Sequence, residues 1–209
     1  SKYTNVEKNI YDLIKEKKSF VRWGDGETAL LLGSDTYFQK SNISNSISLW
    51  KLLMKSQKNS IYIVFPQLNK MVGNVAFTST IELREIVYRI RKNYLSSNCA
   101  LEFRDSEVLR DTFASEMRSA SEVVLICSEK FKDQEHRLKN SFGPRINVIY
   151  CSSHNAALNA LQLEKLMLFD TIILAAGPII KCQVLEVSDL SSKCFVADLG
   201  HGLDRILNG

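Results

Sequence analysis

Short apolar runs recur at fairly regular intervals along this chain. They are rich in Ile, Val, Leu and Phe with little polar alternation, which is typical of strands buried on both faces of a sheet. The strands predicted in this way cover residues 20–23, 61–65, 99–103, 123–127, 146–151, 171–176 and 194–197. Because helix-like segments separate most of them, the pattern predicts an α/β fold, with a mostly parallel sheet and helices on both faces.

Helical spacing marks several of the segments between these strands. The N-terminal segment combines a capping box, Thr4 with Glu7, with apolar residues at helical spacing: Val6, Ile10, Leu13 and Ile14. A second helix is predicted over residues 28–32 and should end at Gly33, and a third should lie behind Ser79 and Glu82. The stretch 36–48, rich in Ser and Asn, is predicted to be a mobile loop, followed as a candidate by 128–144.

The segment Arg-Trp-Gly-Asp-Gly-Glu at 22–27 carries the clearest candidate chemistry. Asp25 and Glu27 stand directly after a predicted strand, and hard cations such as Mg²⁺ or Mn²⁺ prefer carboxylate oxygens while keeping positions open for phosphates. Gly24 and Gly26 permit a sharp turn or close approach to a ligand, and Arg22 suits either phosphate oxygens or one of the acids. The alternative is a solvated turn, for which Gly-Asp-Gly is common.

Polar or glycine-bearing segments follow most of the predicted strands. Examples are Arg104 with Asp105, the pair Gly177-Pro178, and the closing segment 198–204. In a parallel sheet these segments meet at the edge that carries Asp25 and Glu27, which is where ligands bind in open α/β sheets. This convergence favours a binding site over the solvated turn.

Length and composition limit the possibilities further. The 209 residues fit a single domain spanning residues 1–209, and the formal charge of +4 suits anionic small ligands or loose contact with a membrane surface. There is no basic run with interleaved aromatics, so a nucleic-acid partner is not expected. Five cysteines without a Cys-x-x-Cys pair predict buried, reduced thiols and a cytoplasmic protein. No run is long enough for a transmembrane helix, and the chain, which begins without Met, is compatible with a fragment of a larger multidomain protein.

Several motifs, in this order, resemble the GT-D glycosyltransferases, formerly a domain family of unknown function. They are Arg-x-Gly-Asp-Gly-Glu at 22–27, Gly33 followed by Phe38-Gln39, Gly177-Pro178, and Asp-Leu-Gly-His-x-x-Asp at 198–204. The resemblance spans nearly the whole chain. It implies a Rossmann-like sheet of GT-D type and an Asp-x-Glu metal motif holding Mn²⁺ or Mg²⁺. It also implies a hexosyltransferase that moves glucose or a related hexose, with inversion, from a nucleotide donor, typically UDP-glucose, to a hydroxyl of a glycan or glycoconjugate.

Two departures from the family pattern affect the predicted site. Family members carry a Gly-rich segment that contains Thr-Arg and Gly-Asn after the fourth strand, where this chain has residues 128–132. In the closing motif, Arg205-Ile206-Leu207 stands where the family tends to have acidic and aromatic residues. The first departure concerns the donor site. The second concerns the acceptor contacts or the identity of the base.

The resemblance assigns roles to the candidate residues. Asp25 and Glu27 would serve the metal, directly or through water, and Arg22 and Arg104 are candidate partners of the diphosphate or of a carboxylate. For each of these two arginines the alternative is a structural ion pair. Backbone N–H groups after Gly177-Pro178 are predicted to face an anion, the alternative being a plain strand-to-helix turn.

His201 and Asp204 are the candidates for the general base that takes the proton of the acceptor hydroxyl. His201 stands between two glycines, and imidazole titrates in a useful range. Metal coordination or a structural hydrogen bond is the alternative for His201. Asp204 could itself be the base, could orient His201, or could only cap the last helix. Two other functions remain open on these residues: a metal-dependent phosphoryl or nucleotidyl transferase, and a non-catalytic nucleotide-sugar-binding module.

Overall fold

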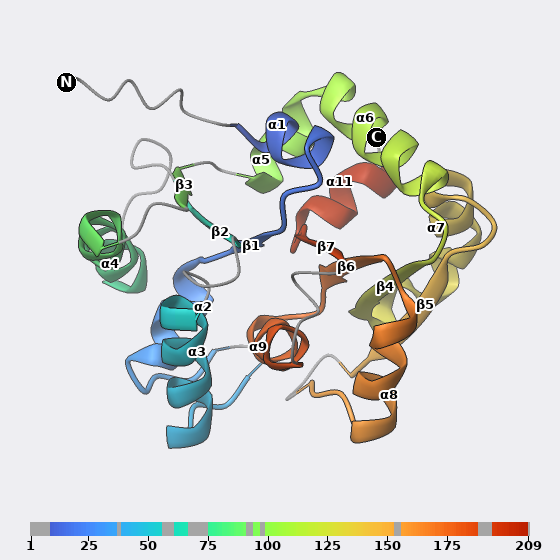
Figure 1. Cartoon of the computed structure of the whole chain (residues 1–209). Helices are drawn as coiled ribbons and strands as arrows, with labels where there is room; N and C mark the ends of the chain where they lie inside the picture. The colour runs from blue at the N-terminus through green and yellow to red at the C-terminus, as the bar shows by residue number, and fades with distance from the viewer. Residues whose placement is uncertain are drawn as a thin grey trace.

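The protein folds around one seven-stranded sheet in which all strands are parallel (Figure 1). A computed structural model describes residues 9–36, 39–55, 61–66, 75–90, 94–96, 99–152, 156–187 and 194–208. The strands follow the order β3-β2-β1-β7-β6-β4-β5. Their bounds are Phe20–Arg22 (β1), Tyr62–Phe65 (β2), Tyr94–Ser96 (β3), Val123–Ser128 (β4), Asn147–Cys151 (β5), Thr171–Ala175 (β6) and Phe195–Asp198 (β7).

Helices connect these strands and cover both faces of the sheet. In Figure 1, α2, α3, α8 and α9 lie below the sheet, and α1, α5, α6, α7 and α11 lie above it. Their bounds are Ile10–Lys15 (α1), Asp25–Leu31 (α2), Ile43–Lys55 (α3), Val75–Ile90 (α4), Cys99–Asp105 (α5), Glu107–Ser119 (α6), Glu135–Phe142 (α7), Ala160–Lys165 (α8), Pro178–Glu186 (α9) and Gly202–Asn208 (α11). Among the described residues, the connections also contain the 3₁₀ helices Glu129–Gln134 (η2) and Leu166–Leu168 (η3).

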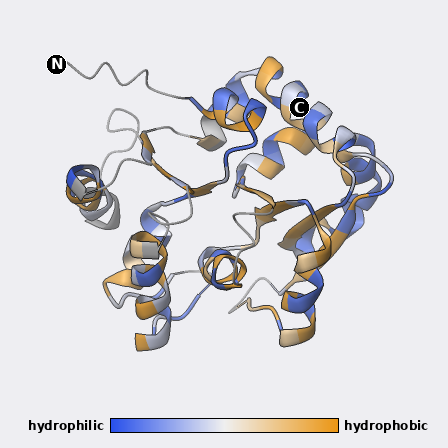
Figure 2. Cartoon of the chain, in the orientation of Figure 1, coloured by the Kyte–Doolittle hydropathy of each residue, from blue (hydrophilic) through white to orange (hydrophobic). Residues whose placement is uncertain are grey.

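The strands separate two apolar cores. The core on the side of α2, α3 and α9 includes Trp23, Leu30, Leu49 and Ile180, while the core on the opposite side includes Phe20, Phe103, Phe113 and Leu203. Along β4, Val124 and Ile126 belong to the first core and Val123, Leu125 and Cys127 to the second, as the two-residue period of a strand requires. Figure 2 shows the resulting pattern, with strands mainly hydrophobic and helices of mixed character. The sequence prediction of an α/β fold with helices on both faces is confirmed.

The chain order creates a switch point beside β1. The chain passes from β1 outward to β2 and β3, crosses to β4 and β5, and returns through β6 to β7, which pairs with β1 at Phe20 and Ala197. Neighbouring strands that belong to opposite directions of winding leave a crevice at their carboxyl ends, where ligands bind in folds of this kind. The predicted motif at 22–27 begins at the end of β1.

One predicted strand was wrong. Residues 99–103 lie in the helix α5, and the third strand is Tyr94–Ser96 instead. Cys99 and Phe103 are four residues apart and both are buried in the same core, which is the spacing of one helical face. A short apolar run does not distinguish a strand from a buried helix turn, and here helical packing prevails.

Both predicted loops contain helices. Residues 43–48 begin α3, and 129–142 form η2 and α7, whose apolar residues Phe131, Leu138 and Phe142 are buried. The first helix begins at Ile10 with a capping box between Asn9 and Asp12, while the predicted box residues Thr4 and Glu7, like Phe38, lie outside the described residues. The helix predicted behind Ser79 begins earlier, at Val75.

All five cysteines are buried free thiols, as the sequence predicts. Burial raises the pKa of Cys99 and of Cys182 to about 12. Within the part of the chain that the structure describes, no helix has the length and apolar character needed to cross a bilayer.

Candidate active site at the carboxyl ends of β1 and β7

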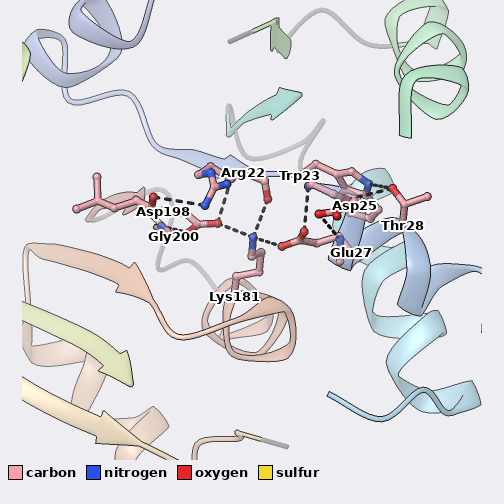
Figure 3. Close-up of polar contacts among 11 residues, drawn as sticks. Arg22, Trp23, Asp25, Glu27, Thr28, Lys181, Asp198 and Gly200 are labelled. Atoms are coloured by element: carbon pink, nitrogen blue, oxygen red, sulfur yellow. Dashed lines mark hydrogen bonds and ion pairs between the residues drawn. The ribbon is translucent and has the colours of Figure 1, made fainter. Parts of the chain in front are cut away.

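A buried lysine ties together the two strand ends that form the switch point. Lys181, in the first turn of α9, donates to the carbonyl oxygen of Arg22 at 2.7 Å (Figure 3). Its Nζ also lies 2.5 Å from Glu27 Oε1 and 2.5 Å from Asp198 Oδ2, with only 5% of the side chain exposed. One ammonium group therefore joins the end of β1, the first turn of α2 and the end of β7.

The two carboxylates keep Lys181 charged despite its burial. Burial on its own would lower the pKa of Lys181, but attraction to Asp198 and Glu27 outweighs it and raises that pKa above its ordinary value. For Glu27, burial acts to raise the pKa, and Lys181, with help from Arg22 and the Gly24 N–H, lowers it on balance. The cluster thus holds two negative charges and one positive charge in a nearly dry position, a geometry that requires every partner to stay in place.

Glu27 is fully engaged by this arrangement. Its second carboxylate oxygen, Oε2, accepts from the Gly24 N–H at 2.9 Å, which caps the start of α2. The predicted turn after β1 is therefore a helix start whose cap is also the partner of Lys181.

Asp25 differs from Glu27 in being exposed. Its Oδ1 accepts from the Gly26 N–H at 3.0 Å, and Figure 3 shows it beside the buried cluster. The helix behind it is anchored in the core, because Trp23 Nε1 donates to Thr28 Oγ1 at 3.0 Å and Thr28 shares a 2.6 Å hydrogen bond with Thr80. Asp25 thus presents a carboxylate to solvent from a rigid support.

Arg22 and Gly200 fit against each other across β1 and β7. The Arg22 guanidinium donates to the Leu199 carbonyl at 3.4 Å, and its backbone N–H donates to Asp198 Oδ2 at 3.0 Å. Gly200 has φ +48°, and a Cβ there would overlap Arg22 Nη1. Glycine at 200 therefore provides both the left-handed backbone and the space for the guanidinium.

His201 and Asp204 form a second, exposed cluster after β7. His201 Nδ1 lies 3.7 Å from Asp204 Oδ2, and Lys130 Nζ contacts both Asp204 oxygens at 3.1 and 3.2 Å. The His201 side chain is 71% exposed. Since α11 begins at Gly202, Asp204 lies inside the helix and is not its N-cap. The structure brings the predicted pair together, and its role as a base stays a prediction.

Gly177 and Pro178 start α9, as the sequence predicts. Gly177 is the N-cap at φ +96°, Pro178 is the first helical residue, and Lys181 follows within the same turn. The turn thus places Lys181 against Glu27 of the 22–27 motif and against Asp198. Whether its N–H groups also face an anion stays a prediction.

Arg104 does not follow a strand, so the reasoning that placed it in the site was wrong in its premise. It lies in the last turn of α5 and forms an exposed ion pair with Asp105. That pair, which raises the pKa of Arg104, is the structural alternative considered from the sequence. Its predicted contact with a diphosphate stays a prediction.

Sequence reasoning missed the central residue of the site. Lys181 is the only charged residue of α9 before Glu186, in an otherwise mostly apolar segment, Pro-Ile-Ile-Lys-Cys-Gln-Val-Leu-Glu. A charge on an apolar helix needs a buried partner, and this signal was available in the sequence. Asp198 belongs to the closing motif at 198–204, but its role as the second carboxylate follows only from the fold.

The donor set fits a divalent cation only in part. Among the described residues, no group of three or more His, Cys, Asp or Glu side chains comes together as a metal site. Asp25 offers an exposed carboxylate, which suits a hard cation that keeps open positions for water and phosphate. Both oxygens of Glu27 already have partners, so a direct bond from Glu27 to a metal would require Lys181 or the Gly24 N–H to leave.

Comparisons with known proteins establish the fold. No family model and no curated protein matches the sequence. Among solved structures, "A New Glycosyltransferase (DUF1792) from Streptococcus sanguinis" superposes with a TM-score of 0.58 and 18% identity, covering 91% of this chain and 78% of the other. A DUF1792 domain described as having "a distinct glycosyltransferase fold" gives a TM-score of 0.64 and 20% identity, with 91% and 75% covered. The chain shares the fold of these DUF1792 structures, as the resemblance in its motifs predicts.

Proposed function

We propose that this protein is a glycosyltransferase that moves a sugar, a hexose such as glucose, from a UDP-linked donor to a hydroxyl of a glycan or glycoconjugate. The observation that carries the proposal is the cluster at the switch point. A lysine-braced pair of acids, an exposed Asp25 and the Arg22 guanidinium gather at the carboxyl ends of β1 and β7. In a fold shared with glycosyltransferase structures, this is the crevice where a nucleotide would bind.

The leaving group of such a reaction is a nucleoside diphosphate. A Mn²⁺ or Mg²⁺ ion, when bound, would stabilise the negative charge that develops on the diphosphate. In this proposal Asp25 holds that ion directly and Glu27 contributes through water, since both Glu27 oxygens are engaged by Lys181 and Gly24. Lys181 keeps Glu27 and Asp198 in place, and Arg22 adds a fixed positive charge beside them.

The acceptor hydroxyl must lose its proton as it attacks the anomeric carbon. His201 is the residue we assign to this task, because it is exposed directly after β7 and Asp204 faces its Nδ1. That arrangement leaves Nε2 for the acceptor hydroxyl and lets Asp204 stabilise the imidazolium that forms. Lys130 holds the Asp204 carboxylate from the other side. Direct displacement with such a base inverts the anomeric centre.

The test is a screen of nucleotide sugars for hydrolysis and transfer, with Mn²⁺ or Mg²⁺ present. We expect slow release of free sugar and UDP from one donor. The Asp25→Asn variant should lose this hydrolysis. The matched control is Asp35→Asn, which removes another exposed acid whose Oδ1 accepts from the Ser41 N–H within a loop. Mass spectrometry of the products separates sugar transfer from phosphoryl or nucleotidyl transfer. Phosphate or nucleotidyl products, or activity unchanged by Asp25→Asn, would refute the proposal.

A further inference from the structure

Helix α3 exposes a stripe of large apolar side chains. Ile43 is 80% exposed, Ile47 49%, Trp50 53% and Met54 46%. Steps of four, three and four residues place these side chains along one side of a helix. The opposite side already fills the core through Leu49, Leu52 and Leu53. The exposed stripe is thus surplus to the core, and apolar surface gathered in this way marks an interaction site.

The charge of the surrounding sequence indicates the kind of partner. No Asp or Glu occurs between Thr36 and Ile81, a segment that contains five lysines: Lys40, Lys51, Lys55, Lys58 and Lys70. These five charges exceed the formal charge of the whole chain, +4, so the remaining residues sum to −1. Positive charge is therefore concentrated in the segment that carries the apolar stripe. A partner surface that is both negatively charged and apolar beneath complements it.

The position of α3 links this surface to the candidate active site. Ser46 Oγ donates to the Leu30 carbonyl of α2 at 2.8 Å, and α3 also packs against α9. Figure 1 shows α3 beside α2 on the outside of the molecule. Because α2 carries Asp25 and Glu27 and α9 carries Lys181, whatever holds the outer side of α3 lies close to the elements that form the site.

We propose that the outer side of α3 docks on a membrane surface that contains anionic phospholipids. Helices with a large apolar side, a Trp and nearby lysines lie in the plane of the interface, where apolar side chains enter the acyl boundary and lysines attract lipid phosphates. Trp50 suits that boundary because its ring is both apolar and polar. A second copy of this chain fits less well, since a two-fold contact through α3 would bring two acid-free, lysine-bearing segments together.

The protein carries its own reporter for this docking. It has two tryptophans, of which Trp23 is 1% exposed in the core and Trp50 lies on the stripe. We expect the full chain to co-sediment with vesicles of phosphatidylcholine mixed with phosphatidylglycerol, and to bind vesicles of phosphatidylcholine alone only weakly. On binding, Trp50 emission should shift to shorter wavelength and be quenched by brominated acyl chains. Added salt should weaken the binding.

Variants distinguish binding through the exposed stripe of α3 from non-specific adsorption to vesicles. The double change Ile47→Ser and Trp50→Ser should weaken binding at least about tenfold, because both side chains leave the acyl boundary. Lys51→Glu should weaken binding to anionic vesicles by about fivefold or more, because a lysine near the surface is exchanged for a repelled acid. The matched control is Val108→Ser, which removes an exposed apolar side chain from α6 on the other face of the sheet and should leave binding unchanged.

Three results would overturn the proposal. One is the absence of binding to anionic vesicles, and another is binding that neither the double variant nor Lys51→Glu reduces. The third is a concentration-dependent dimer in light scattering, without lipid, that the double variant abolishes, since this would assign the stripe to a second copy. None of these measurements depends on glycosyl transfer, so the proposed function stands or falls separately.

Discussion

Two clusters of oppositely charged side chains lie where β1 and β7 end, and the clusters differ mainly in burial. In the inner cluster, Lys181 lies between Glu27 and Asp198, with 5% and 4% of the Lys181 and Asp198 side chains exposed. In the outer cluster, Lys130 and His201 meet Asp204 near solvent. The comparison shows how burial divides the labour. A buried ion pair cannot exchange partners without a large cost and therefore positions its neighbours, while an exposed one can gain and lose protons during a reaction.

The sharpest way to break the inner cluster is Lys181→Met. This change keeps the apolar stem but leaves Glu27 and Asp198 as two buried carboxylates without a cation. We expect the free energy of unfolding to fall by about 3–5 kcal/mol, as for the removal of one partner of a buried pair. Urea denaturation measures the loss, and transfer activity should disappear with it. The control is Lys130→Met in the exposed cluster, for which we expect less than about 1 kcal/mol. Equal losses in the two variants would show that burial does not distinguish the two clusters.

The outer cluster should respond in activity and not in stability. His201→Gln removes the proposed base, so kcat should fall about 10²–10⁴-fold, the usual contribution of general base catalysis. Because the side chain is 71% exposed, the midpoint of thermal unfolding should hardly change. Asp204→Asn should reduce kcat less, since the imidazole remains. Steady-state kinetics over a pH range gives the second readout, because the limb assigned to His201 should vanish in His201→Gln. A kcat that survives both changes would move the base elsewhere.

Gly200→Ala tests the contact between the two strand ends. The new methyl group would occupy the position of Arg22 Nη1, and the guanidinium is the flexible part that must move. We expect KM for the nucleotide sugar to rise about tenfold, together with a backbone cost of about 1 kcal/mol at positive φ. Gly33→Ala is the matched control, since Gly33 has φ +84° with nothing within 4 Å of its Cβ position. It should show the backbone cost and leave KM alone. If the two variants have the same KM, Arg22 does not contribute to the donor site.

The smallest effect we predict is the loss of folding stability at acid pH that results from protonation of Glu27. Its pKa is lowered in the folded protein, so its contribution is complete above the ordinary value of 4.5 and is lost as pH falls through the lower folded value. Lys181 acts in the opposite sense, because its raised pKa keeps its contribution intact up to the ordinary value of 10.5. The midpoint temperature of thermal unfolding should be lower for Glu27→Gln at pH 7, and it should fall less steeply between pH 7 and pH 3 than that of the unchanged protein. Parallel curves would show that other carboxylates govern the acid limb.

Much of the fold could be predicted because burial on both faces leaves a local signature. The strands β4 and β6 are continuous runs of apolar residues, and the helices between them carry apolar residues at their own spacing. The exception at residues 99–103 is equally instructive. Four apolar or small residues interrupted by Glu102 fit either a strand or one buried side of a helix. Only the packing of Phe103 against Phe113 and Gly202 decides between them.

The candidate site was predicted where its residues are close in sequence and missed where they are not. Asp25, Glu27, His201 and Asp204 stand in short motifs whose chemistry can be read locally. Lys181 stands alone in an apolar helix, 154 positions from Glu27 along the chain. Arg104 shows the reverse case, since a local reading placed it after a strand although it ends a helix.

The sequence by itself determined a parallel α/β sheet with helices on both faces, buried thiols, and a pair of acids at the end of the first strand. Periodicity and backbone preference act over a few residues, so these features are encoded where they occur. Only the tertiary structure decided that Lys181 joins one of those acids, Glu27, to Asp198, because that contact depends on β7 lying beside β1 and on α9 starting at the same edge of the sheet. The strand order that sets this neighbourhood results from packing the whole chain. Burial then makes the Lys181 contacts strong, since charges taken out of water must find each other.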